Sequence, residues 1–114
     1  MGEVTSMSIF QLLLNFDDQL VDWILHASPS NDVEREAMRR VLALRGELED
    51  DLNKLVAFRL KASVAALPDQ AARLTSLASA MQATEQTVEN AAKVISTAGE
   101  VVSIAAKVLA FALA

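Results

Sequence analysis

The most regular hydrophobic pattern in the chain lies between Leu74 and Ala112. Apolar or small residues recur there at alternating steps of three and four, which is the heptad spacing of a helix with one buried seam. The large members of this seam are Leu74, Leu77, Met81, Val88, Ile95, Val102 and Leu109. The spacing predicts one continuous helix over about residues 69–113. Its seam needs a facing helix, because a lone helix in water would leave these side chains exposed.

An N-terminal apolar pattern predicts a helix over about residues 8–27. One face carries Ile9, Leu13, Phe16, Leu20 and either Trp23 or Ile24, and a second face carries Phe10, Leu14, Val21 and Leu25. The apolar surface is therefore wider than the roughly 100° stripe of an ordinary surface helix. We expect burial on two sides, with Phe10, Leu14 and Trp23 as candidates for a partner surface. Trp23 is also a natural core residue at this spacing.

The segment from Ser28 to Asn31 interrupts the helical pattern. Asn31 and Glu34 then form a capping box that starts a helix over about residues 31–66. The apolar stripe of this helix carries Val41, Leu44, Leu48, Leu52, Leu55 and Ala62. Phe58 and Leu60 lie off the main stripe, near the end of the helix, and are further candidates for a partner surface.

Charged residues also fall inside this stripe. The carbon stems of Arg45 and Arg59 can lie along the apolar surface with their charged ends in water. The alternative is a buried polar layer in which Arg45 or Arg59 pairs with Asp18 or Asp22 of the first helix. Such a layer would fix the register of the helices more than it would stabilise them.

The turn Leu67-Pro68-Asp69 is short, so the helices on either side should form an antiparallel hairpin. The expected fold is all-α, a single domain over residues 1–114 in which the shorter first helix packs on this hairpin of two long helices. The alternative is a fourth helix, because Thr97-Ala98-Gly99-Glu100 matches a capping box. Since the heptad phase continues across residues 95–102, we favour a continuous helix in which Gly99 marks a close helix approach.

The charge distribution and the reactive side chains exclude several classes of function. The net charge is −5 and no basic stripe is present, which argues against nucleic acid as a partner. The chain has no cysteine and one histidine, so a metal site of cysteines or of several histidines cannot be built from one chain, and His26 is the only histidine available to a relayed nucleophile. We therefore expect no enzyme activity, no catalytic or metal-ligating residue and no cofactor.

The apolar surface of the chain suggests two hypotheses about function. Beyond Val94 a second apolar row, which includes Val101, Ile104 and Val108, joins the seam. In the expected bundle the first helix covers this row, and the surplus apolar surface lies on the second face of the first helix and at Phe58 and Leu60. A non-enzymatic helical interaction protein that self-associates explains this surplus, with a homodimer favoured over another helical partner. The alternative is a membrane-active protein, pore-forming or interfacial, that uses the apolar C-terminal helix. The first basic residue is Arg35, so a signal peptide is not expected and a cytoplasmic location is favoured over membrane association.

Overall fold

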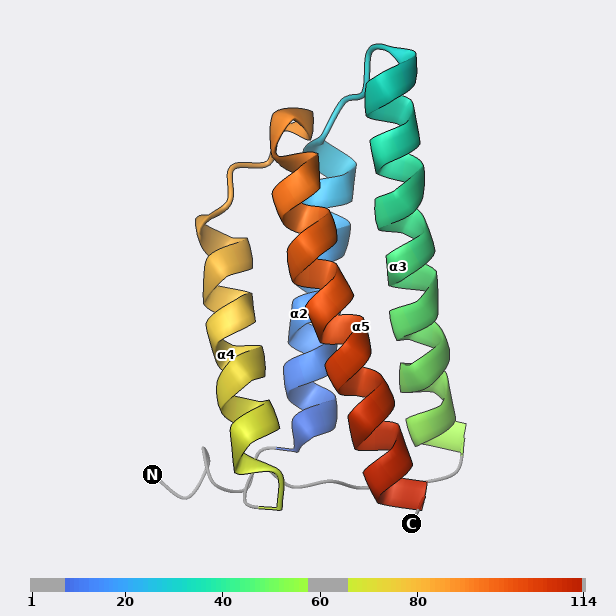
Figure 1. The fold of residues 1–114 in the computed structure, drawn as a ribbon, viewed down its shortest axis with the longest axis vertical. Helices are drawn as coiled ribbons and strands as arrows, with labels where there is room; N and C mark the ends of the chain where they lie inside the picture. The colour runs from blue at the N-terminus through green and yellow to red at the C-terminus, as the bar shows by residue number, and fades with distance from the viewer. Residues whose placement is uncertain (1–7, 58–65, 114) are drawn as a thin grey trace.

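The protein was analysed as a computed structural model that describes residues 8–57 and 66–113 (Figure 1). These residues form four α-helices and one short 3-10 helix: α2 (Ile9–His26), α3 (Asp32–Ala57), α4 (Pro68–Ala83), η1 (Val88–Asn90) and α5 (Ala91–Leu113). The all-helical prediction is confirmed for this part of the chain. The second predicted helix is described as far as Ala57, so its expected extension to residue 66 lies largely outside the described residues.

The four helices pack side by side around one core. In Figure 1, α2 and α4 run in one direction, and α3 and α5 run in the other. Both α2 and α5 pack against α3 and against α4, whereas no Cα atoms of α3 and α4 come within 8 Å of each other in the described ranges. As far as α3 and α4 are described, they do not pack on each other, so the expected hairpin is not confirmed. Instead α3 lies beside α5, and these two helices run parallel.

The predicted third helix is broken, and this corrects the expectation of a continuous helix over residues 69–113. α4 ends at Ala83, where Thr84 adopts an extended conformation (φ −80°, ψ 126°), and α5 begins at Ala91. The Thr84 backbone N–H donates to the Met81 carbonyl, and its hydroxyl donates to the Ala80 carbonyl at 2.8 Å. The break has no glycine or proline to cause it. Hydrogen bonds therefore hold the chain in a turn at residues that could continue a helix.

Gly99 lies inside α5, so the alternative break at this position is also wrong. The Thr97 hydroxyl donates to the Lys93 carbonyl at 2.9 Å, as in a helix interior, and does not cap a new helix. A Cβ atom added at Gly99 would meet nothing within 4 Å. Gly99 therefore does not mark a close helix approach.

The predicted helix starts agree with the structure. The Ser8 hydroxyl caps α2 by accepting from the Gln11 N–H at 3.2 Å. Asn31 caps α3 through its side-chain oxygen, which accepts from the Glu34 N–H at 2.8 Å. The Glu34 carboxylate returns to Ser30, whose N–H and hydroxyl both donate to it. These bonds satisfy backbone donors that have no partner within the helix.

The core draws large side chains from α2 and smaller ones from α5. Its largest fully buried members are Trp23, Phe16, Ile9, Leu13, Leu20, Leu48, Leu74, Val41, Val94, Val101 and Val108. The α4 part of the predicted seam is buried at Leu74, Leu77 and Met81. In α5 the alanine row and the second apolar row face the core, while the large seam residues, Val88 of η1 and Ile95, Val102 and Leu109 of α5, are half-buried. The break lets α5 present a different face from the one that the continuous heptad predicts.

Candidate functional site

A partly buried ion pair joins α2 to α3, but its members differ from those predicted. Arg45 Nε lies 3.3 Å from Asp17 Oδ1, and Arg45 Nη2 lies 3.3 Å from Glu49 Oε1. Asp18 and Asp22 are exposed and make no ion pair with Arg45 in the described part of the chain. Asp17 could have been found from the sequence, because it lies four residues after Leu13 and three before Leu20, inside the buried stripe. Arg59 lies outside the described residues.

Burial controls the charge state of Asp17, whose residue is only 6% exposed. Removal from water raises the pKa of this carboxyl above its ordinary value of 3.8, because the charged form is poorly solvated there. The hydrogen bond and positive charge of Arg45 lower the pKa and offset part of this effect. The negative charges of Glu49 and Asp18 raise it further. The pair therefore joins the two helices at a cost in desolvation.

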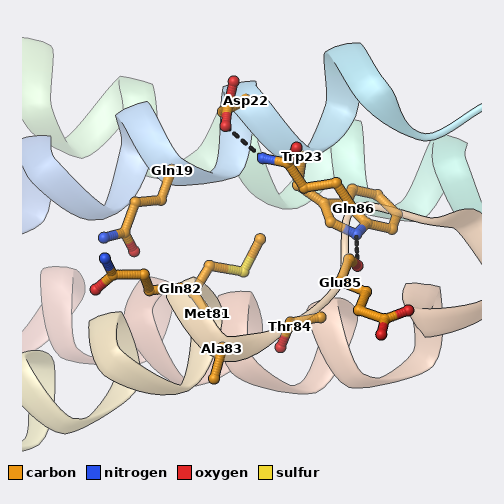
Figure 2. A pocket seen from close by; sticks show the side chains of 9 residues that line it. All are labelled: Gln19, Asp22, Trp23, Met81, Gln82, Ala83, Thr84, Glu85 and Gln86. Atoms are coloured by element: carbon orange, nitrogen blue, oxygen red, sulfur yellow. Dashed lines mark hydrogen bonds between the residues drawn. The ribbon is translucent and has the colours of Figure 1, made fainter.

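A cavity of about 450 Å³ opens beside Trp23, between α2 and the break after α4 (Figure 2). Its lining consists of Gln19, Asp22, Trp23, Met81, Gln82, Ala83, Thr84, Glu85 and Gln86. The amides of Gln19 and Gln82 lie at one side, and Gln86 lies near the indole ring at the other. The Gln19 Oε1 atom is buried and has no hydrogen-bond partner within the described residues. This lining offers amide groups, the carboxylates of Asp22 and Glu85 and the hydroxyl of Thr84.

Two side chains of α2 hold the break beside this cavity. Trp23 Nε1 donates to the Glu85 carbonyl at 3.2 Å, and the Gln86 amide donates to the Asp22 carboxylate (Figure 2). The Trp23 side chain is fully buried in the core. It is therefore a structural residue of the monomer and is not exposed for a partner.

The other predicted partner-surface residues are distributed unevenly. Phe10 is half-buried and Leu14 is 38% exposed on α2. Phe58 and Leu60 lie outside the described residues.

His26 contacts Asp22 through its Nδ1 atom, 3.5 Å from Oδ1, on the exposed side of α2. Within residues 8–57 and 66–113, no group of three or more His, Cys, Asp or Glu side chains is placed to hold a metal ion.

A regular row of partly buried apolar residues follows η1 and α5. We call Val88, Ile95, Val102 and Leu109 the outer row: these residues repeat every seven positions and are all half-buried. Small residues flank the outer row at Ala92, Gly99 and Ala106. A shallow groove of about 300 Å³ borders it, lined by Arg40, Ala43, Leu44, Ile95 and Gly99. At the end of the helix, Phe111 is 48% and Leu113 is 59% exposed.

The same segment is long and apolar enough to cross a membrane. Val88–Leu113 spans 26 residues; its most apolar 18-residue window has a mean hydropathy of 1.6, and 39% of that window is buried. The core helix of a soluble protein has the same length and composition, so this property does not decide between the two environments.

No known protein family, characterised protein or solved structure matches the chain. Its function is therefore inferred from the distribution of its own residues.

Proposed function

We propose that this protein is a non-enzymatic helical interaction protein that self-associates, with a homodimer as the favoured state. The observation that supports the proposal is the outer row of α5. Four large apolar residues at seven-residue spacing pack against the edge of the core and stay only partly buried, although full burial of each is worth roughly 1.5–3 kcal/mol. Association of chains along this row would recover part of that free energy.

A second copy of the chain fits the outer row because a heptad row is complementary to another heptad row. Two such rows pack as knobs into holes, and a two-fold axis places the same surface on both partners. The flanking residues Ala92, Gly99 and Ala106 carry little side-chain volume, so a partner helix can approach α5 closely. No cluster of charge interrupts the row between Val88 and Leu109.

Light scattering at micromolar concentration tests the proposal, and the expected mass is larger than that of one chain. Ile95→Asp should reduce this association, because it places a charge in the outer row. Ser96→Asp is the matched control, since Ser96 is exposed on the neighbouring side of the helix. A wild-type chain that stays monomeric and binds no hydrophobic dye would show that the chain covers its own apolar surface.

A second candidate function is membrane activity through α5. The support for it is the length and hydropathy of Val88–Leu113 together with the exposure of Phe111 and Leu113. This function requires α5 to leave the core, because Val94, Val101 and Val108 are fully buried there. The two functions therefore make opposite demands on the same helix.

Removal of residues 101–114 separates the two candidates. If α5 is a core helix, the truncation deletes Val101, Ala105 and Val108 and should unfold the chain, because proteins of this size have little stability to spare. If α5 serves the membrane, the truncated chain should remain helical and lose binding to vesicles. Circular dichroism of the truncation and flotation of the intact chain with liposomes are the two measurements. We expect unfolding and no flotation.

A further inference from the structure

The break between α4 and α5 occurs where the local sequence favours a helix. No glycine or proline lies between Pro68 and Gly99, and the heptad seam crosses residues 84–90 without a shift. Natural helix ends are usually marked by such residues or by a change of pattern. The sequence of this segment therefore supports both a bent and a straight chain.

Contacts with α2 hold the bent form. Trp23 donates a hydrogen bond to the Glu85 carbonyl, and Asp22 accepts one from Gln86 (Figure 2). Within the bend, the Asn90 amide also donates to the Glu85 carbonyl and to the Thr87 hydroxyl, each at 3.2 Å. If α2 and this segment separate, the bend keeps only its local hydrogen bonds, and the burial of α5 in the core is what then opposes the straight helix.

A straight chain cannot remain in its own core. A helix over residues 68–113 would be about 69 Å long at 1.5 Å per residue. The molecule measures 44 Å along its longest axis. α5 would therefore project beyond the end of α4, with Val94, Val101 and Val108 exposed to water. At the same time, the surface of α2, α3 and α4 that α5 covers would be left open.

We propose that two copies of the chain dimerise by straightening at residues 84–90 and exchanging α5, so that α5 of each copy fills the open core of the other. This proposal rests on the proposed self-association and specifies its geometry. The partner is a second copy because only the same α2, α3 and α4 surface reproduces the contacts that α5 makes in the monomer. The Arg73 guanidinium, which holds the Glu100 carboxylate at 2.7–2.9 Å, re-forms this pair between chains.

The exchange also uses the surface that the monomer leaves exposed. In a two-fold dimer the two straightened segments cross each other, since each joins an α4 to an α5 in the opposite core. Val88 lies in that segment, and Ile95 follows it by two turns. These half-buried residues are the apolar side chains available to cover the crossing.

Glu85→Pro distinguishes the bent form from the straight form. Proline disfavours a helical conformation in the residue before it, and Thr84 is already extended in the bent chain. The substitution keeps the backbone carbonyl that accepts from Trp23, and the Glu85 N–H donates no hydrogen bond among the described residues. In a straight helix the same proline removes a backbone hydrogen bond and clashes with the preceding turn. Glu85→Ala is the matched control, because it removes the same side chain and permits a helix.

The first measurement is the mass by light scattering of the wild type, Glu85→Pro and Glu85→Ala after refolding at high concentration. We expect dimers for the wild type and Glu85→Ala, and a helical monomer for Glu85→Pro. A folded Glu85→Pro chain that dimerises as the wild type does would overturn the exchange and leave self-association intact. A wild type that is monomeric at every concentration would overturn both proposals.

The second measurement does not depend on whether the proline variant folds. The chain has no cysteine, so spin labels can be placed at Ala72→Cys and Ala110→Cys, both exposed positions. Labelled chains are diluted into unlabelled chains, so that electron–electron double resonance reports distances within one chain. In the bent form the start of α4, which carries Ala72, and the end of α5, which carries Ala110, lie at the same end of the molecule (Figure 1). In the exchanged dimer they lie about 57 Å apart along one helix. A dimer fraction with only the short distance would exclude the exchange.

Discussion

Helices α2 and α5 both carry many apolar residues, but they divide them differently between core and surface. In α2 the large residues Phe16, Leu20 and Trp23 lie in the core. In α5 the buried face is built mainly from alanine and valine, with Ile104 as its largest residue, and Leu109 and Phe111 lie at the margin or in water. The interior therefore depends on the large side chains of α2, whereas α5 retains apolar surface on its other side.

The break after Ala83 explains this difference. A continuous helix would keep the large seam residues of α4 and α5 on one face, but separate helices can rotate independently. α5 turns its alanine row and its second apolar row toward the core. The small residues suit close packing beside α3 and α4. As a consequence, the large seam residues of α5 lie at the margin of the core, where they are only partly buried.

The largest predicted effect comes from the phenylalanines of the two helices. Phe16→Ala should lower the free energy of unfolding by about 3–5 kcal/mol, because Phe16 is 0% exposed and its removal leaves a cavity. Phe111→Ala should lower it by less than about 1 kcal/mol, because this side chain is already half in water. Urea denaturation followed by circular dichroism measures both. Equal losses of unfolding free energy in the two variants would mean that the end of α5 contributes as much to the stability of the core as α2 does.

A smaller effect is expected at Gly99. Gly99→Ala should raise the free energy of unfolding by about 0.5–1 kcal/mol, since alanine is the better helix former and the added Cβ meets no atom within 4 Å. Gly46→Ala in α3 is the matched variant, because Gly46 has the same open surroundings. Thermal unfolding of both variants checks the values. A lower free energy of unfolding for Gly99→Ala, without a loss for Gly46→Ala, would show that a side chain at position 99 meets atoms that the packing does not place there.

The smallest effect concerns the buried carboxyl of α2. Because burial raises the pKa of Asp17, the folded state binds its proton more tightly than the unfolded state does. The contribution of Asp17 is therefore most favourable below pH 3.8 and is lost as the pH rises through the folded-state pKa. Relative to Asp17→Asn, the wild type should become less stable over that rise in pH.

Denaturation of the two chains at pH 3.5 and pH 7 measures this difference, and Asp18→Asn is the exposed control. A wild type that gains stability over Asp17→Asn as the pH rises would mean that the attraction of Arg45 outweighs the cost of burial.

Local signals in the sequence predicted the helices well. The first helix was expected over residues 8–27 and is found at Ile9–His26, because its apolar period and the polar segment after it are both strong. The start of α3 at Asp32 and of α4 at Pro68 follow from capping and proline geometry. Each of these features depends on residues within one or two turns of the boundary.

Features set by contacts between helices were not predicted. The break at residues 84–87 depends on Trp23 and Asp22, which lie more than 60 positions earlier in the chain. The position of the break also decides that α5, and not α4, packs beside α3. For this reason the expected hairpin was not found among the described residues. The partner of Arg45 was misassigned for a related reason, because the choice among neighbouring aspartates depends on how α2 is rotated against α3.

The most direct test of the difference between the two faces of α5 compares two adjacent valines. Val101 is fully buried and Val102 belongs to the outer row, so Val101→Ala and Val102→Ala remove the same atoms from opposite environments. Unfolding free energies and dimer dissociation constants, the latter by sedimentation, should be measured for both. We expect Val101→Ala to cost about 2 kcal/mol of folding stability with dissociation unchanged. Val102→Ala should cost less than half as much and weaken the dimer several-fold. Equal losses of folding stability with no change in dissociation would contradict a division of α5 into a core face and an association face.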